Sequence, residues 1–96
     1  MDEDEYECNA AKAERNLAKH GVSFEAARCV FDDVFAIERC DFDSAPGEVR
    51  YVITGMVNDV ILTVVYTERV DRTRIISARR ATKHEREEYY RSQTAE

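Results

Sequence analysis

The sequence predicts a small α+β domain, with an antiparallel sheet of about four strands, two N-terminal helices on one face and a C-terminal helix. Three observations support this fold class. Two capped helical segments come first, four β-rich segments follow within residues 34–79, and a Thr-x-x-Glu capping box opens the last helix. The length of 96 residues fits one domain, residues 1–96, and leaves no room for a second.

The first helix is predicted over residues 10–20. Asn9 is its N-cap, because the Asn side-chain oxygen accepts a hydrogen bond from an unpaired backbone N–H of the first turn. Lys19 and His20 are cations in the last turn, where they complement the helix dipole, and Gly21 supplies the left-handed residue that ends the helix. The segment contains few apolar residues, so we expect it on the outside of the domain.

The second helix is predicted over residues 24–31, with Ser23 as its N-cap. Phe24, Ala27 and Phe31 recur at the spacing i, i+3, i+7, which places them on one side of a helix. We therefore expect this helix to pack its apolar stripe against the sheet.

Four strands are expected, over residues 34–40, 49–57, 60–67 and 73–79. Asn58 and Asp59 form a two-residue connection between the second and third strands, which indicates a hairpin. The third strand is rich in apolar and β-branched residues on both faces, so we expect it in the centre of the sheet. Residues 41–47 are predicted as a loop, and residues 68–72 as a polar turn. The helix opened by Thr82 and Glu85 runs to about residue 91.

Strand alternation separates the two arginines of the fourth predicted strand. Arg74 shares a face with Ala78, whereas Arg79 shares the other face with Ile75. Both arginines can line one cleft only if a bulge or a strand end lies between them.

Charge is distributed unevenly along the chain, whose net charge is −6. Residues 1–48 contain 5 Lys or Arg and 13 Asp or Glu, whereas residues 49–96 contain 9 and 7. Within the second half, residues 69–86 contain seven basic and two acidic residues, which indicates an electropositive stripe on an acidic protein. Such a stripe is either a surface for an anionic partner or a solvated strand edge and helix face.

Composition and motifs exclude several classes of protein. No apolar segment approaches the length of a membrane span, and the acidic N-terminus is the reverse of a secretory signal, so we expect a cytoplasmic protein with no membrane contact. Cys8, Cys29 and Cys40 form no Cys-x-x-Cys pair, so neither a disulfide nor a cysteine metal site is expected. No phosphate-binding glycine loop, zinc-ligand spacing or serine nucleophile motif occurs, and we predict neither a cofactor nor a metal.

The polar residues that can carry chemistry lie mostly near helix ends and strand ends. His20 suits general acid–base chemistry near neutral pH, although a His at a helix C-terminus also serves simply as a dipole partner. Arginines at strand ends are more often surface residues than catalytic ones. In the last helix, we expect one of Tyr89 and Tyr90 to dock on the sheet and the other to be free to stack on a base. The full set of candidates is Lys19, His20, Glu48, Arg50, Tyr66, Glu68, Arg69, Arg74, Arg79 and Tyr89.

Two blocks of the sequence carry a recognisable pattern. The first block is Lys19-His20-Gly21-Val22-Ser23-Phe24-Glu25-Ala26-Ala27. The second runs from Thr67-Glu68-Arg69 through Arg74-Ile75-Ile76-Ser77-Ala78-Arg79 to Ala81-Thr82. Further matching positions are Lys12, Asn16, Val30, Phe31, Asp33, Gly47, Glu48, Arg50, Gly55, Glu85 and Tyr89. Over about residues 6–89, the chain resembles the BrnT family of type II toxins.

The resemblance implies a RelE-like fold and a metal-independent, ribosome-independent endoribonuclease that cleaves RNA and inhibits translation. It also implies a hetero-oligomer with a separately encoded antitoxin that has a DNA-binding domain. It assigns catalysis to His20, Arg50, Glu68 and Arg79, and substrate binding to Lys19, Tyr66, Arg69, Arg74 and Tyr89. Arg50 and Arg79 would stabilise charge on the phosphate, and His20 or Glu68 would transfer the proton.

The chain departs from the family pattern in two places. Cys8-Asn9 stands where the family usually has Trp-Asp, and Val70 stands where it usually has Gly. Asn9 keeps the capping role, and Val70 indicates an altered turn. An alternative function is therefore a catalytically weak or inactive toxin homologue that binds the antitoxin in operon autoregulation. A third hypothesis is a small α+β domain with an unrelated ligand.

Overall fold

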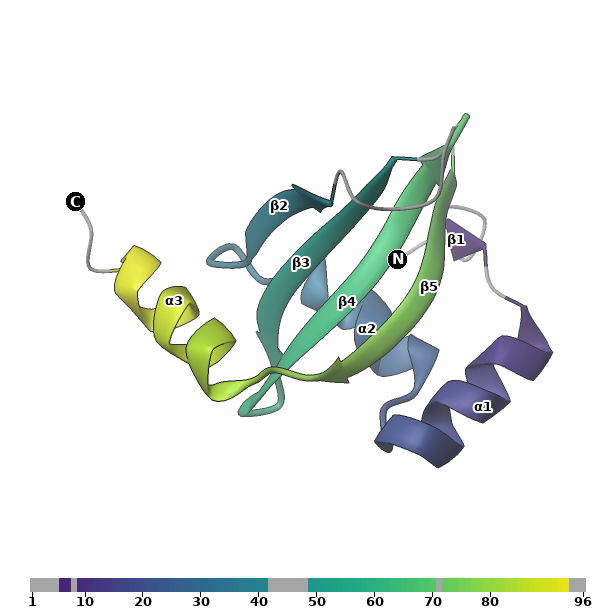
Figure 1. Cartoon of the computed structure of the whole chain (residues 1–96), viewed down its shortest axis with the longest axis horizontal. Coiled ribbons are helices and arrows are strands. Elements are labelled where there is room, and N and C mark those ends of the chain that lie inside the picture. The colour runs from purple at the N-terminus through teal and green to yellow at the C-terminus, as the bar shows by residue number, and fades with distance from the viewer. Residues whose placement is uncertain (1–5, 8, 42–48, 71, 94–96) are drawn as a thin grey trace.

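The structure is a computed structural model that describes residues 6–7, 9–41, 49–70 and 72–93. Within these residues the elements are β1 (Tyr6–Glu7), α1 (Ala10–His20), α2 (Phe24–Val30), β2 (Ile37–Asp41), β3 (Arg50–Val57), β4 (Val60–Arg69), β5 (Arg72–Arg80) and α3 (Lys83–Gln93). The strands form one sheet in the order β1-β5-β4-β3-β2 (Figure 1). Strands β2 to β5 are an antiparallel meander with β4 in the centre, which confirms the predicted fold class.

The main core lies between one face of the sheet and α2. Phe24, Ala27 and Val30 of α2 are buried there against apolar residues of β3, β4 and β5. Ala13 of α1 packs against the same cluster, so both N-terminal helices lie on one side of the sheet, as predicted. Figure 1 shows α2 behind the sheet. The sheet residues of this cluster are Ile53, Leu62, Val64, Tyr66, Ile75 and Ala78.

Helix α3 packs on the opposite face, where it covers only one end of the sheet (Figure 1). Tyr89 is buried there with Ile61 and Ala81, and its hydroxyl donates to Asp33 Oδ2 at 2.5 Å. Tyr90 is half exposed, which confirms that one tyrosine of this pair docks on the sheet and the other does not. None of the described helices is long and apolar enough to cross a membrane. We call the sheet surface beside α3 the open face.

A buried asparagine joins α1 to the edge of the sheet. Asn16 Nδ2 donates to the backbone oxygens of Val22 at 2.9 Å and Ala78 at 2.8 Å, and Asn16 Oδ1 accepts from Ala78 N at 3.1 Å. The side-chain amide thus pairs with the backbone of Ala78 in β5 as a neighbouring strand would. The short strand β1 does not reach this residue, because it pairs only with Thr73 and Arg74. Asn16 therefore covers backbone groups that an edge strand otherwise leaves unpaired.

The predicted helix ends and turns are largely confirmed. Asn9 Oδ1 accepts from two backbone N–H groups of α1, and Ser23 Oγ accepts from Ala26 N. Asn58 and Asp59 have φ values of 50° and 69°, the left-handed pair that a two-residue hairpin turn of type I′ requires. Gly21 ends α1 at φ 70°.

Some strand boundaries differ from the prediction. Residues 34–36 are not strand, because Asp33 Oδ1 accepts from Phe35 N at 2.9 Å and Asp33 O accepts from Ala36 N at 3.0 Å, which closes a turn. Strand β2 therefore begins at Ile37. The predicted polar turn at residues 68–72 is shorter than expected, since β4 extends to Arg69 and β5 begins at Arg72. The parallel strand β1 was not predicted. Residues 42–47 of the predicted loop lie outside the described residues, as do Cys8 and Glu48.

Val70 adopts the left-handed conformation that the family pattern assigns to Gly. Its φ is 45° and its side chain is fully exposed. A β-branched residue in this region costs about 1–2 kcal/mol, because its Cβ approaches the carbonyl oxygen. The turn after β4 is therefore strained at this residue, which agrees with the altered turn expected from the sequence.

Replacing Asn16 by Ala is expected to lower the free energy of unfolding by about 2–4 kcal/mol, because the buried backbone groups of Ala78 and Val22 lose their partners. Urea unfolding followed by circular dichroism measures the change. Lys12→Ala, an exposed change on the same helix, is the control and should shift stability by less than about 0.5 kcal/mol. Equal effects of the two variants would contradict the role of Asn16 at the sheet edge.

Candidate functional site

A bulge in β5 brings two arginines to the same face. Val65 pairs with Ser77 and Tyr66 pairs with Ile75, so Ile76 is an extra residue in β5. Arg79 pairs with Thr63 and Arg74 pairs with Thr67, and these two threonines lie on the same face of β4. This is the bulge between Arg74 and Arg79 that the sequence analysis required for the two side chains to share a face, and both lie on the open face.

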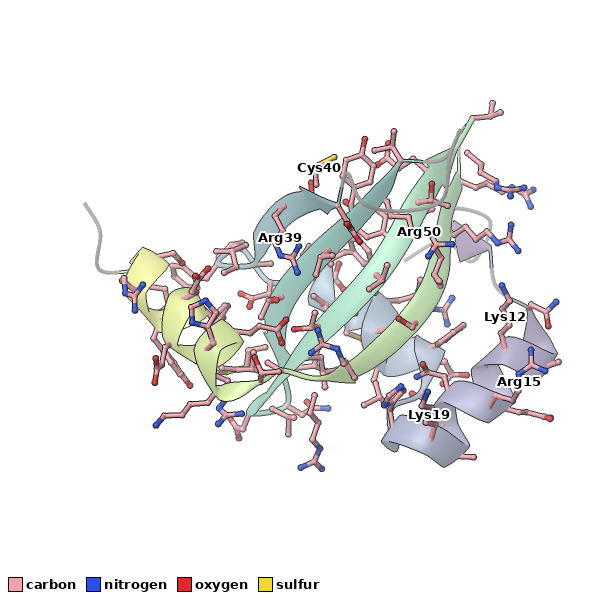
Figure 2. All side chains as sticks on the ribbon, in the orientation of Figure 1. Lys12, Arg15, Lys19, Arg39, Cys40 and Arg50 are labelled. Atoms are coloured by element: carbon pink, nitrogen blue, oxygen red, sulfur yellow. The ribbon has the colours of Figure 1, made fainter. Side chains whose placement is uncertain are left out.

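Two further arginines lie on this face. Arg39 of β2 pairs with Val52, which in turn pairs with Val65, and Arg50 lies two residues before Val52 on β3. Figure 2 shows Arg39 and Arg50 over the same side of the sheet. The open face thus carries arginines from three strands, and we call Arg39, Arg50, Arg74 and Arg79 the arginine face.

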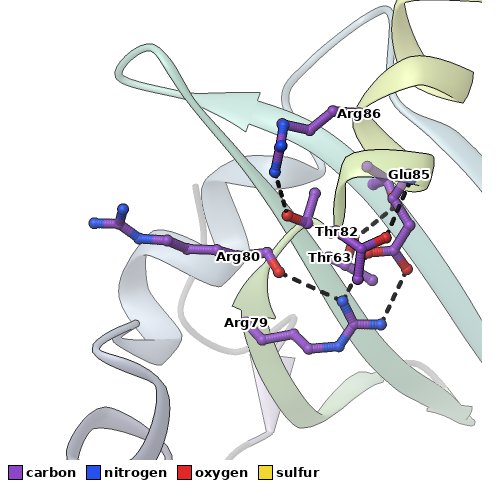
Figure 3. Close-up of polar contacts among 8 residues, drawn as sticks. Thr63, Arg79, Arg80, Thr82, Glu85 and Arg86 are labelled. Carbon is purple, nitrogen blue, oxygen red and sulfur yellow. Dashed lines mark hydrogen bonds and ion pairs between the residues drawn. The ribbon is translucent and has the colours of Figure 1, made fainter.

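Arg79 is held by a carboxylate of α3 (Figure 3). Its Nη1 and Nη2 donate to Glu85 Oε1 at 2.7 Å and Oε2 at 3.0 Å. Glu85 Oε1 also accepts from Thr63 Oγ1 at 3.0 Å and Thr82 N at 2.8 Å, and Thr82 Oγ1 accepts from Glu85 N at 3.2 Å, which confirms the predicted capping box. The hydrogen bond from Arg79 is the main cause that lowers the pKa of Glu85 to about 2. Glu85 is therefore a fixed counterion and a weak base.

The other three arginines have no such counterion. Arg39, Arg50 and Arg74 form no hydrogen bond or ion pair with any other described residue. The Nε atom of Arg50 is buried without a hydrogen-bond partner among the described residues, which is costly unless a ligand supplies an acceptor. These three guanidinium groups can therefore bind an anion without first breaking a contact to another described residue.

Two predicted site tyrosines have structural contacts. Tyr66 is buried in the main core on the face opposite the arginines, donates a hydrogen bond to Glu38, and meets Phe31 edge-on at 4.9 Å between ring centroids. Burial, with the hydrogen bond and charge of Glu38, raises the pKa of Tyr66 above its ordinary value. Burial and the hydrogen bond to Asp33 likewise raise the pKa of Tyr89 to about 12.

The remaining predicted residues lie around the sheet. Glu68 pairs with Thr73 on the face of Tyr66 and is exposed, so the structure does not bring it to the arginine face. Arg69 is exposed at the end of β4. His20 is half-buried one turn beyond Asn16, on the side of α1 that faces β5.

Lys19 continues a basic stripe along α1. Lys12, Arg15 and Lys19 are exposed and recur at the spacing i, i+3, i+7, which places them on one side of the helix. Figure 2 shows the three side chains along α1. The helix therefore adds positive charge beside the β5 end of the sheet.

A pocket of about 280 Å³ lies where α3 meets β2 and β3 on the open face. Sequence reasoning missed the pocket and also Arg39, because both depend on where α3 crosses the sheet. No group of three His, Cys, Asp or Glu side chains within the described residues is arranged to share a metal ion. The residues that line the pocket include Ile37, Arg39, Val52, Thr54, Glu88 and Ser92.

Comparison with protein families identifies one match. A family model described as the ribonuclease toxin BrnT of a type II toxin–antitoxin system matches residues 9–85, which is most of the chain. No curated protein matches the sequence. The matched range contains the four arginines, Glu85 and most of the pocket, but ends before Glu88 and Ser92.

The Arg79–Glu85 pair is expected to make stability depend on acid pH. The pKa of Glu85 falls from an ordinary value of 4.5 to about 2 in the fold, so its stabilisation is present above pH 4.5 and is lost as the pH falls towards 2. We expect Glu85→Gln to cost about 1–2 kcal/mol at pH 7, a value reduced because Arg79 is partly exposed. Urea unfolding at pH 7, 5 and 3 should show the difference from the native protein shrinking with acid.

Glu87→Gln is the matched control, because Glu87 is exposed on the same helix. The difference in stability between this variant and the native protein should be the same at all three pH values. If Glu85→Gln and the native protein lost stability equally between pH 5 and pH 3, the fixed-counterion role of Glu85 would be refuted.

Proposed function

Because the chain belongs to the BrnT family of ribonuclease toxins of type II toxin–antitoxin systems, we propose that it is an endoribonuclease that cleaves single-stranded RNA without a metal ion and thereby inhibits translation. The arginine face is the observation that carries this proposal. It presents three guanidinium groups that have no partner among the described residues, beside a fourth that is held by Glu85. RNA is the polyanion that such a surface suits, because arginine donates two parallel hydrogen bonds to a phosphate and keeps its charge throughout a reaction.

The proposed reaction is transfer of the phosphate to the neighbouring 2′-oxygen. The 2′-hydroxyl loses its proton and attacks phosphorus, the bond to the 5′-oxygen breaks, and the leaving oxygen takes up a proton. The products are a 2′,3′-cyclic phosphate, which can hydrolyse to a 3′-phosphate, and a 5′-hydroxyl end. Charge develops on the phosphate oxygens in the transition state, and fixed cations stabilise it.

The arginines have different proposed roles in binding the phosphate and stabilising its charge. Arg50 and Arg74 bind the reacting phosphate, because they are on one face and have no partner among the described residues. Arg79 has five N–H donors and uses three in hydrogen bonds to Glu85 and the Arg80 carbonyl, so two remain for a phosphate oxygen. Its charge is largely neutralised by Glu85, and we therefore assign it to positioning as well as to charge stabilisation.

His20 is the proposed proton-transfer residue. It lies on the side of α1 that faces β5, and imidazole exchanges protons near neutral pH. Glu68, the other candidate, is exposed on the face of the sheet that α2 covers. His20 is preferred because Asn16 joins its helix to the β5 edge, and β5 carries Arg74 and Arg79. Lys19 and Arg69 are proposed to bind flanking phosphates. Tyr66 and Tyr89 contribute by fixing the sheet and α3 beneath the site.

The proposed partner is an antitoxin with a DNA-binding domain, which binds the toxin in a hetero-oligomer in the cytoplasm. An acidic or amphipathic segment of the antitoxin would cover the arginine face, which includes Arg74 and Arg79 of the basic stripe at residues 69–86. A weak or inactive homologue that retains only this binding is the second candidate function. The neutralisation of Arg79 by Glu85 and the strained Val70 turn favour it.

Arg50→Ala is expected to lower the rate of RNA cleavage by on the order of 10²-fold, by analogy with loss of one oxyanion donor. Arg80→Ala is the matched control, because Arg80 is exposed on β5 and points to the opposite face from Arg79. It should change the rate less than about threefold. The measurement is cleavage of a labelled single-stranded RNA in excess EDTA, with analysis of the product ends.

Three outcomes of this assay would contradict the proposed chemistry. They are loss of cleavage with EDTA, equal cleavage of a substrate that lacks the 2′-hydroxyl, and equal loss of rate in the two arginine variants. Absence of cleavage by the native protein, with intact antitoxin binding, would instead establish the second candidate function.

Association with the antitoxin is expected to slow on the order of tenfold between low and high salt, because complementary charge accelerates encounter and salt screens it. Surface plasmon resonance at increasing sodium chloride concentrations measures the on-rate. The double variant Arg50→Ala with Arg74→Ala should flatten the salt dependence, whereas Arg80→Ala should preserve it. An on-rate independent of salt would rule out the arginine face as the docking surface.

A further inference from the structure

The pocket beside the arginine face has the size of a site for one heterocycle. Its volume of about 280 Å³ falls just below the range of sites that hold drug-sized ligands. Ile37 of β2 and Val52 of β3 give it an apolar floor, and Glu88 and Ser92 of α3 form part of its wall. An apolar floor with a few polar groups at the side suits a flat ring that carries hydrogen-bonding groups at its edge.

Charge within the pocket favours a base over a phosphate. Glu85 and Glu88 of α3 line it, and Arg39 is the one cation among the lining residues that the structure describes. The Glu85 carboxylate is already paired with Arg79, whereas the Glu38 carboxylate is bonded to Tyr66 on the other face of the sheet. A phosphate there would be repelled by the Glu88 carboxylate. A neutral nucleobase would not, and the Arg39 guanidinium, which has no partner among the described residues, offers a plane on which a base can stack.

The pocket adjoins the phosphate-binding arginines. Arg39 pairs directly with Val52 in the pocket floor, and Arg50 lies two residues from Val52 on the same face, roughly 7 Å along the strand. The backbone of Arg50 is therefore close enough to the pocket floor for one nucleotide to reach both the Arg50 side chain and the pocket. The two sites are arranged to hold neighbouring parts of one nucleotide.

We propose that this pocket binds one base of the RNA next to the cleaved phosphate and selects a base with an exocyclic amino group, as in adenine, cytosine or guanine, over uracil. The proposal rests on the proposed ribonuclease function. Glu88 provides the selection, because an ionised carboxylate only accepts hydrogen bonds and so pairs with an amino group. Its Oε1 holds His84 Nε2 at 2.9 Å, and its Oε2 has no partner among the described residues.

Single-site substrates test the proposal. Short oligonucleotides with one ribose among deoxyriboses restrict cleavage to one phosphate, and the base beside it is varied among adenine, cytosine, guanine and uracil. The native protein should cleave the substrates with an amino-bearing base about tenfold faster than the uracil substrate, a ratio expected from one charged base contact. Glu88→Gln should reduce this preference to about twofold without slowing uracil cleavage, because the Gln amide donates as well as accepts.

Two further variants sharpen the test. Glu87→Gln is the matched control, since Glu87 is the preceding residue of α3, is exposed and does not line the pocket, and it should keep the native preference. Arg39→Ala should raise KM for all four substrates and leave their order intact. Cleavage by the native protein with a base preference that Glu88→Gln leaves unchanged would overturn the pocket assignment while the ribonuclease function stands.

A binding measurement separates failure of the pocket from failure of the ribonuclease function. If the native protein cleaves no RNA, titration with adenosine and uridine monophosphates by amide NMR decides the assignment. Shifts at residues of the pocket with the adenine nucleotide, reduced in Glu88→Gln, would support it. Absence of shifts with either nucleotide at millimolar concentration, or equal shifts with both, would overturn it.

Discussion

One extra residue in β5 determines which side chains reach the open face. In a regular strand, Arg74 would point into the core side with Ala78, where α2 packs, and only Arg79 would face outward. The bulge at Ile76 reverses this for the residues before it, so Arg74 joins Arg79 while Ile75 fills the core. The same bulge thus places Ile75 in the core and Arg74 on the cationic surface. A register slip of one residue in β5 would damage both.

The arginine face combines one fixed cation, Arg79, with three arginines that have no partner within the described part of the chain. Thr54, Thr63, Glu85 and Arg79 form a continuous hydrogen-bonded series that connects the centre of the sheet to the first turn of α3. This series fixes the helix start, and with it the wall of the adjacent pocket. The other three guanidinium groups have no such restraint from the residues that the structure describes. Rigid support beneath adaptable contacts is a common arrangement in binding sites.

The features that sequence predicted correctly are local in the chain. The helix caps, the hairpin turn at Asn58 and Asp59, and the Thr82–Glu85 capping box depend on residues two or three positions apart. The pairing of Asn16 with Ala78 joins residues 62 positions apart, and no local signal indicates it. Arg39 and the pocket depend on how α3 crosses β2 and β3. Strand alternation showed that Arg74 and Arg79 share a face only if a bulge or a strand end lies between them. The bulge itself depends on how β5 pairs with β4, which the sequence of β5 alone does not reveal.

The Asn16 contact also has a consequence for how the protein is made. On the ribosome, α1 emerges early, but the β5 residue that its amide pairs with is synthesised only 62 residues later. The arginine face and Glu85 likewise come from elements at both ends of the meander. A nascent chain therefore carries no complete site until β5 and α3 have been translated, and domains assemble as whole units as synthesis proceeds. The arginine face is therefore completed only when nearly the whole chain has been synthesised.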